Sequence, residues 1–421
     1  MELEAHLFRR EAGRIVAILA RLFGIHNLSL VEDVVQEAFC RALETWKFHG
    51  IPHNPAAWLM TTAKNRALDV LRRQRTERRF ATEYQLFIES EWTLKPAVDD
   101  AFDGKGLNDA LLSMMFTCID PEFPEETQIA LALHLVCGFG ADEIAAAFLK
   151  SLPATQKRLT RAKKTLAESK QLFALVDPDQ VAARLAIVMR AIYLLFSGGY
   201  HGNSRRQVVR SDLCEEAIRL AFLLTENRTT STPAVLAMTA LFHFNLARLP
   251  GRLDAEGNLL LLADQDRSNW DQRLIAEGRR LLDRASTGTQ LSSYHLEAGI
   301  AALHADAPST EETDWQAIVS LYDVLMNVEP SPVVALNRAI AIAECDGPTE
   351  GLEQISRIAD SRRLSRYPYF FAAIAELKLR IGQFNEAQEY FYKALDLAQN
   401  PAERSFFLRR IETSSQQQQS R

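Results

Sequence analysis

Apolar residues recur at three- and four-residue steps through most of this chain, which is the spacing of amphipathic α-helices rather than of strands. The clearest case is the stretch 54–79. Its apolar stripe consists of Trp58, Leu59, Ala63, Ala67, Val70 and Leu71. Asn54 suits an N-cap, and Pro55 suits a first helical position because its missing N–H would have been unpaired there. The pattern predicts a helix of about 20 residues that packs through this stripe.

The other faces of this helix are cationic. They carry Lys64, Arg66, Arg72, Arg73, Arg75, Arg78 and Arg79, against only Asp69 and Glu77. A solvated charged face is the usual interpretation of one basic helix taken alone. Such a surface would also bind the phosphates of a nucleic acid.

Two further amphipathic helices are predicted before it, at 3–23 and 29–46. The second opens with acidic residues, which suit the positive end of the helix dipole. The stretch Lys47–His53 that follows displays aromatic, imidazole and glycine residues, with Trp46 assigned to the core. We expect a loop here, either a simple connector or a pocket that receives a base.

Residues 80–108 lack steady periodicity and predict a linker between domains. Helical spacing resumes at 109–118 and again from Glu125. A short helix around Ile144 then leads, through a break at 151–153, into a longer helix with a basic outer face. Such a pair matches a helix-turn-helix, and the alternative is an ordinary amphipathic hairpin.

From Val181 onward the pattern is helical throughout, and a repeat emerges near the end. Small and aromatic residues stand where a tetratricopeptide repeat needs them, namely Gly382, Phe384, Ala387, Phe391 and Ala394. The stretches 315–326 and 333–343 fit a degenerate copy. We predict a stacked helical array with a concave protein-binding face; the alternative is an unrelated bundle.

One charged cluster lies between these helices, and it consists of Asp264, Gln265, Asp266, Arg267 and Asp271. Ser268 is expected to cap a helix, with Asp271 returning the bond. Helix capping and ion pairing are the first explanation of the cluster. A ligand or partner site is the other.

Composition narrows the class of protein. The 421 residues predict two or three domains, and they contain no apolar run of 18 residues and no signal-peptide pattern, which predicts a cytoplasmic protein without a membrane segment. The five cysteines form no CxxC, so neither disulfides nor a zinc site is expected. HExxH, GxSxG, P-loop and GxGxxG motifs are absent. We therefore predict no enzyme activity, no metal and no cofactor.

The net charge of −6 is unusual for a free-standing DNA-binding protein, which normally has a basic field that steers it to DNA. An acidic chain with two local basic helices is expected to bind DNA only when another protein holds it there.

Several motifs together resemble one family. EDVVQEAF at 32–39, PAAWLMTTAKNRALDVLRR at 55–73, and DEIAAAFL followed by TQKRLTRAKKTL resemble regions 2 and 4 of RNA polymerase sigma factors of the extracytoplasmic function type. YLLFSGGY at 193–200, DWQAIVSLYDVL at 314–325 and SPVVALNRAIA at 331–341 resemble the C-terminal extension of one group of these factors. The resemblance thus spans nearly the whole chain.

The resemblance implies an all-α protein of two small helical sigma domains and a C-terminal domain with tetratricopeptide-like repeats. Region 2 would occupy 1–80, the linker 81–108, region 4 109–172 and the extension 173–421. The partners implied are core RNA polymerase, through its β′ clamp and β flap, and promoter DNA. A protein or small-molecule regulator of the C-terminal domain would be a further partner.

The resemblance also implies roles for individual residues. Those expected to bind core polymerase are Asp33, Gln36 and Glu37. Those expected at the −10 element, where a flipped base is captured and the backbone is bound, are Phe48, His49, Asn54, Lys64, Arg66, Arg72 and Arg73. Those expected at the −35 element are Thr155, Gln156, Arg158, Arg161, Lys163 and Lys164. One departure is an extra residue between Ile144 and Thr155, which is expected to alter the turn.

The alternative function is a conventional helix-turn-helix regulator with a repeat-type sensor domain. It accounts for residues 125–421 but leaves the first 79 unexplained. A regulator of that class would bind duplex DNA alone, whereas a sigma factor requires polymerase.

Overall fold

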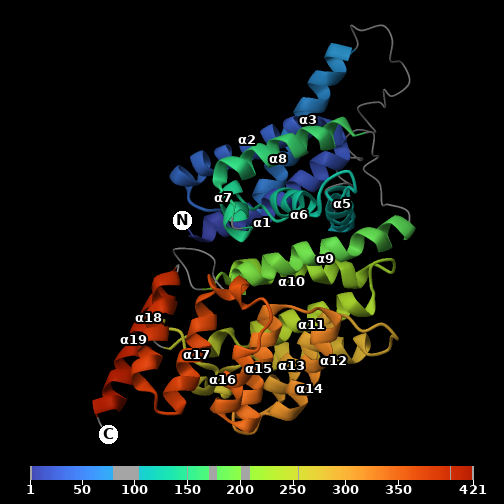
Figure 1. Ribbon diagram of the computed structural model, residues 1–421. Coiled ribbons are helices and arrows are strands. Elements are labelled where there is room, and N and C mark those ends of the chain that lie inside the picture. The colour runs from blue at the N-terminus through green and yellow to red at the C-terminus, as the bar shows by residue number, and fades with distance from the viewer. Residues whose placement is uncertain are drawn as a thin grey trace. The chain divides into compact units, whose positions relative to one another are not determined.

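The computed structural model describes residues 2–78, 104–148, 150–169, 178–200, 209–254, 256–398 and 400–419, and these residues are helical with no β-strand (Figure 1). Two compact units are present. Unit 1 comprises residues 1–195 together with 226–230, and unit 2 comprises 196–225 together with 231–421. The all-α prediction is confirmed.

The N-terminal part of unit 1 is a bundle of three long helices. They are α1 (Glu2–Phe23), α2 (Leu28–His49) and α3 (Pro55–Arg78), with a 3-10 turn η1 (Ile25–Asn27) between the first two. Ile15, Ile18 and Leu59 are completely buried where these helices meet. Leu59, Ala63, Ala67 and Val70 of the predicted stripe are buried in α3. The Asn54 side chain accepts a hydrogen bond from the amide of Ala57 at 3.0 Å, as an N-cap should.

The second part of unit 1 contains shorter helices. They are α5 (Gly104–Thr117), α6 (Glu125–Leu135), α7 (Ala141–Ala147), α8 (Leu152–Glu168) and the part of α9 (Pro178–Tyr200) up to Leu195. Leu159, Ala162 and Leu166 of α8 are buried as predicted. The pair α7–α8 is present, and four residues, 148–151, separate the two helices along the chain.

Three element boundaries differ from the predicted ones. Helix α2 continues through Lys47, Phe48 and His49, so the loop before α3 is shorter than expected and begins at Gly50 with φ 76°. Helix α5 begins at Gly104, inside the predicted linker, whose other residues up to 103 lie outside the described ones. Helix α8 begins at Leu152, because a proline is tolerated in the first helical turn.

Unit 2 is a succession of helices, and from α11 onward each packs on the next in sequence. They are α10 (Ser211–Glu226), α11 (Pro233–Ala247), α12 (Gln272–Ala285), α13 (Ser293–Asp306), α14 (Trp315–Val328), α15 (Pro332–Asp346), α16 (Pro348–Ser356), α17 (Pro368–Arg380), α18 (Phe384–Leu397) and α19 (Pro401–Gln419). Short 3-10 turns are η2 (Leu249–Gly251), η3 (Leu262–Asp264), η4 (Arg267–Asn269) and η5 (Ser361–Leu364).

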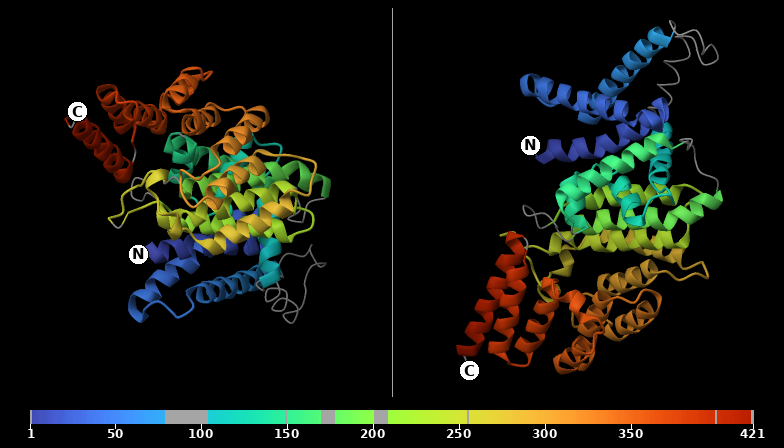
Figure 2. Two further views of the ribbon diagram at one scale, coloured as in Figure 1. Left: turned by 90° about the horizontal axis from the view of Figure 1, so that it is seen from below. Right: turned by 45° about the horizontal axis from the view of Figure 1, so that its top comes forward.

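The C-terminal repeat pattern corresponds to real helix hairpins. Helices α17, α18 and α19 pack in order, as the red end of the ribbon shows (Figure 2). Gly382 turns the chain between the first two with φ 80°, and Ala387 and Phe391 are completely buried between the helices. The pair α14–α15 is also observed. Membership of the tetratricopeptide class stays a prediction.

The acidic cluster at 264–271 is mainly a set of caps. Asp271, and not Ser268, is the N-cap of α12, since its side chain accepts hydrogen bonds from the amides of Arg273 and Leu274. Asp266 caps η4 by accepting from the amide of Ser268 at 2.9 Å. Ser268 was the wrong cap because the chain makes a 3-10 turn there before α12 begins.

One described segment, Val181–Tyr200, is long and apolar enough to cross a membrane, with a mean hydropathy of 1.6. Half of it is buried within the protein. The prediction that the chain has no apolar run of 18 residues therefore does not extend to this mostly apolar segment. The segment includes two arginines: Arg184 donates to the carbonyl of Phe116 at 3.1 Å, and Arg190 pairs with Glu125 at 2.9 Å.

Candidate nucleic-acid interface

The acidic face of α2 is open to solvent. Asp33, Gln36 and Glu37 are all exposed, while Val34 and Val35 between them are buried. The alternation follows from the helical period, which turns the polar residues outward once the valines pack inward. Three of the predicted site residues therefore form one exposed face of one helix.

The C-terminal end of α2 presents apolar surface. Phe48 is 79% exposed, with the ammonium of Lys47 5.8 Å from its ring centre, and Leu43 and Ile51 are about half exposed. Trp46 is buried as expected, and its ring packs against Trp58 at 5.5 Å between centroids. An exposed aromatic ring among exposed aliphatic groups can stack on an unpaired base.

Helix α3 carries its basic residues at two degrees of exposure. Arg72 and Arg73 are exposed, whereas Lys64 and Arg66 are half-buried. Arg66 pairs with Glu37 of α2 at 2.7 Å, so a residue expected to bind DNA touches one expected to bind polymerase. His49 and Asn54 lie exposed on either side of the loop that joins the two helices.

Helix α8 divides its predicted contacts in the same way. Gln156, Arg161 and Lys164 are exposed. Arg158 instead pairs with Glu126 of α6 at 2.8 Å, and Lys163 with Glu32 of α2 at 2.5 Å. These two cations are therefore held by carboxylates of other helices.

Thr155 differs from the rest of the predicted set because its side chain is buried, with 5% exposed. Its hydroxyl donates to the carbonyl of Ser151 at 3.1 Å. That bond occupies the hydroxyl in the first turn of the helix, so the side chain faces the interior of unit 1.

The Lys163–Glu32 pair belongs to a small cluster. His134 of α6 places its Nε2 4.0 Å from the same carboxylate, and its Nδ1 donates to the carbonyl of Phe139 at 2.8 Å. Burial is the largest influence on this ring, and the pKa of His134 is lowered below its ordinary value. The neutral imidazole leaves Lys163 as the cation that balances Glu32.

The two halves of unit 1 are also packed by their backbones. A Cβ added at Gly13 of α1 would lie 1.9 Å from the carbonyl oxygen of Val136, so α1 passes against the end of α6 closer than any side chain allows. Arg9 of α1 pairs with Glu143 of α7 at 2.9 Å and lies over the ring of Phe139. The two parts of unit 1 are therefore in direct contact, through side chains and backbone.

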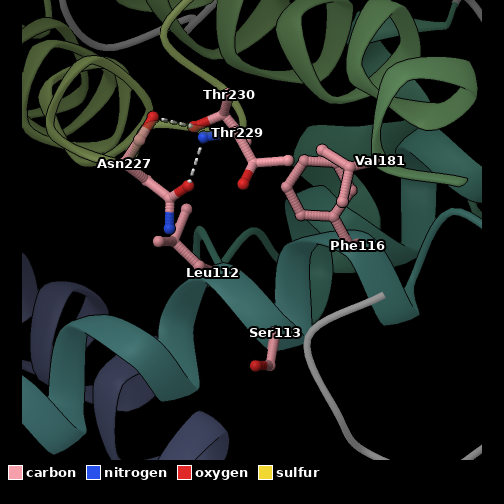
Figure 3. Close-up of a pocket in the computed structure, with 7 residues that line it drawn as sticks. All are labelled: Leu112, Ser113, Phe116, Val181, Asn227, Thr229 and Thr230. Carbon is pink, nitrogen blue, oxygen red and sulfur yellow. Dashed lines mark hydrogen bonds between the residues drawn. The ribbon is translucent and has the colours of Figure 1, made fainter. Parts of the chain in front are cut away.

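A small cavity of about 80 Å³ lies in unit 1 between α5 and residues 227–230 (Figure 3). Its lining consists of Leu112, Ser113, Phe116, Val181, Asn227, Thr229 and Thr230. The Asn227 side chain accepts from the amide of Thr229 at 2.9 Å and so shapes a turn. Residues 226–230, far along the chain, thereby complete the packing around α5.

Sequence reasoning missed Glu32 and Glu126 as partners of the basic helix. In the sequence Glu32 is followed by Asp33 and Glu126 is preceded by Glu125, so neither stands out from its acidic neighbour. A pairing between residues 131 positions apart leaves no local signal from which it could have been found.

Comparison with known proteins gives the class. Residues 7–77 match sigma-70 region 2, and residues 184–286 match a family of unknown function (DUF6596). The first match supports a factor of the sigma-70 family, with the role in transcription initiation and the binding of core RNA polymerase and promoter DNA that region 2 implies. The sigma-70 family is not a class of enzymes.

A relative covers almost the whole chain. It is "Uncharacterized protein R00370" of Rhizobium meliloti (strain 1021), 38% identical over 395 residues, which are 94% of this chain and 92% of the relative. The chain belongs to the same family as this protein. No solved structure matches this chain significantly.

Proposed function

We propose that the protein is a sigma factor of the extracytoplasmic function type that recognises both promoter elements and is regulated in cis by its C-terminal helices. The exposed face of α2 binds core polymerase, Phe48 and His49 capture an unstacked base of the −10 element, and α8 enters the major groove at −35. Such factors act in the cytoplasm.

The observation that carries this proposal is the surface at the end of α2. Asp33, Gln36 and Glu37 are exposed on the same helix that ends in the exposed ring of Phe48, within the region that matches sigma-70 region 2. Base stacking on an aromatic ring contributes roughly 1–3 kcal/mol per base. The conventional regulator has no use for this surface, because it would bind DNA that remains double-stranded.

In α8 the exposed Gln156 is suited to read a base edge, and Arg161 and Lys164 to bind phosphates. Arg158 joins them after leaving Glu126. For Thr155 we propose a role in starting the helix, since its hydroxyl is already bonded and buried.

We infer further that the described arrangement of unit 1 is a closed form. The two promoter elements are separated by about 25 base pairs, or roughly 80 Å of B-form DNA. Helices α2 and α8 lie close together, since the ammonium of Lys163 and the carboxylate of Glu32 are 2.5 Å apart. Two helices in direct contact cannot reach elements that far apart, so we propose that the two halves separate before both elements are read, which also breaks the Arg9–Glu143 pair and the close approach at Gly13.

The test is run-off transcription with purified core polymerase on a pool of promoter fragments, with and without the protein. New start sites sharing paired upstream elements are expected. Phe48→Ala should reduce open-complex formation, whereas Tyr392→Ala, which removes an exposed ring of α18, should not. Asp33→Lys should weaken core binding, and Glu412→Lys on α19 is its matched control. Duplex promoter binding without polymerase would overturn the proposal.

A further inference from the structure

Two guanidinium groups share one indole ring in unit 2. The guanidinium carbons of Arg248, at the end of α11, and Arg267, in η4, each lie 5.2 Å from the ring centre of Trp270. Neighbouring like charges repel, and the repulsion grows as water is excluded. Burial first, and Arg248 second, lower the pKa of Arg267 below its ordinary value.

Arg267 is held by neutral acceptors. Its side chain is buried, with 6% of the residue exposed. Nη1 donates to the carbonyls of His304 and Ala307 at 2.8 and 3.0 Å, and Nη2 donates to the hydroxyls of Thr310 and Thr313 at 3.3 and 3.0 Å. These bonds fix the position of the guanidinium but do not neutralise its charge; the exposed carboxylate of Glu311 acts on Arg267 through space and only partly opposes the lowering of its pKa.

Four nitrogen atoms around this position are buried and make no hydrogen bond among the described residues. They are Nε of Arg248, Nε of Arg267, Nε1 of Trp270 and Nδ1 of His304. Trp270 itself is 2% exposed. A buried donor without a partner costs about 1–3 kcal/mol, and more when the group is charged. Four of them together are therefore expensive unless an acceptor binds there.

His304 adds a neutral donor rather than a third charge. Burial and the two arginines lower its pKa to about 3, so the imidazole is uncharged at neutral pH and can carry its proton on Nδ1. The set thus combines two cations with neutral N–H groups, which is what an oxyanion requires.

The four residues are not equally buried. A Cβ at Gly251 would lie 2.8 Å from Nε1 of Trp270, so the glycine backbone packs directly against the edge of the indole and a side chain there would displace it. Arg248 and His304 are half-buried, whereas Arg267 and Trp270 are buried. A small group can therefore approach from the side of Arg248.

We propose that Arg248, Arg267, Trp270 and His304 bind the carboxylate or phosphate group of a small molecule. This explains why Arg267, a member of the charged cluster at 264–271, and Trp270 next to Asp271 are buried beside a second arginine. The site lies entirely in unit 2, and its test needs neither polymerase nor DNA.

The test is isothermal titration calorimetry of the full-length protein with inorganic phosphate and, separately, with succinate, at constant ionic strength. Saturable binding of one probe or both is expected, and the stronger of the two identifies the source of the oxyanion. Arg248→Gln should weaken binding at least tenfold, because a charged hydrogen bond is lost. Arg273→Gln, which removes an exposed arginine of α12, is the matched control and should bind as the wild type does.

A second variant tests whether binding depends on the shape of the site or only on its positive charge. Gly251→Ala keeps every charge but places a methyl group against the indole N–H, so it should also weaken binding. Circular dichroism of each variant checks that the helices are retained. The proposal is overturned if neither probe binds saturably, or if Arg248→Gln and Gly251→Ala bind as the wild type does.

Discussion

The carboxylate of Glu32, on α2, connects the two halves of unit 1 through its ion pair with Lys163 of α8. Its partner Lys163 is 24% exposed at the side chain, so the pair is partly shielded from water. We expect Glu32→Lys to lower the stability of unit 1 by up to about 1 kcal/mol, and the exchange Glu32→Lys with Lys163→Glu to recover most of the loss. Thermal melting of the wild type, Glu32→Lys, Lys163→Glu and the exchanged protein measures this coupling.

Glu44→Lys supplies the control, since Glu44 is exposed on the same helix. It makes the same change of charge away from α8. Equal effects of Glu32→Lys and Glu44→Lys, or no recovery in the exchanged protein, would contradict a specific pair.

His304 gives unit 2 a pH dependence with a definite sign. Its pKa is lowered from 6.5 to about 3 in the folded protein, so below pH 6.5 the unfolded chain binds a proton that the folded one rejects. Stability is therefore full above that pH and falls as the pH decreases towards 3. Between pH 7 and 5 the expected loss from this residue is up to about 2 kcal/mol.

Urea unfolding at pH 7 and 5 checks this expectation. His304→Gln should lose less stability over that interval than the wild type, while His53→Gln, at an exposed position, should lose as much as the wild type. Equal losses in all three proteins would rule out the assigned pKa.

Local chemistry was predictable from the sequence at the residue scale, and distant pairing was not. The Asn54 cap, the buried Trp46 and the exposed Phe48 each depend on neighbours within a few positions, and the structure has them as expected. The bonds of Lys163 to Glu32 and of Arg267 to His304 depend on how remote helices pack. Helical periodicity carries no information on that packing.

Element boundaries follow the same division. Asn54 and Pro55 placed the start of α3 correctly, because their effect on the backbone is local. The end of α2 was set three residues too early, since Lys47, Phe48 and His49 look like loop residues although they continue the helix. What ends it is Gly50 with its positive φ.

The close approach of α1 to α6 is the feature of whole elements most open to test. Replacing Gly13 by alanine would place a methyl group 1.9 Å from the Val136 carbonyl oxygen, and backbone atoms must move to make room. Although alanine favours a helix by about 1 kcal/mol, the clash should dominate and lower the stability of unit 1 by at least about 2 kcal/mol.

Gly198→Ala is the matched control, because nothing lies within 4 Å of a Cβ at that helical position in α9. It should leave the melting temperature unchanged or raise it. Destabilisation by both alanines to the same extent would remove the close contact as the cause.

On the scale of the whole molecule, the sequence predicted separate domains, and the compact units divide the chain elsewhere. The predicted extension begins at 173, yet unit 1 continues to Leu195 and includes 226–230. The physical reason lies in Arg184 and Arg190, which bind residues of α5 and α6. Cutting the chain at 175 would remove these contacts, so tests of function are better made with the full-length protein.

The proposed opening of unit 1 can be tested by joining its two halves covalently. Cysteines at Glu32 and Lys163, introduced with Cys40→Ser to remove an exposed thiol, can be joined by a cleavable bismaleimide. If the halves must separate to read both promoter elements, the joined protein should lose at least tenfold in promoter-dependent transcripts and recover when the linker is cleaved. Glu389→Cys with Lys393→Cys, joined within α18, is the control and should remain active. Full transcription by the protein joined between α2 and α8 would show that the closed arrangement is itself competent, and the proposed opening would have to be abandoned.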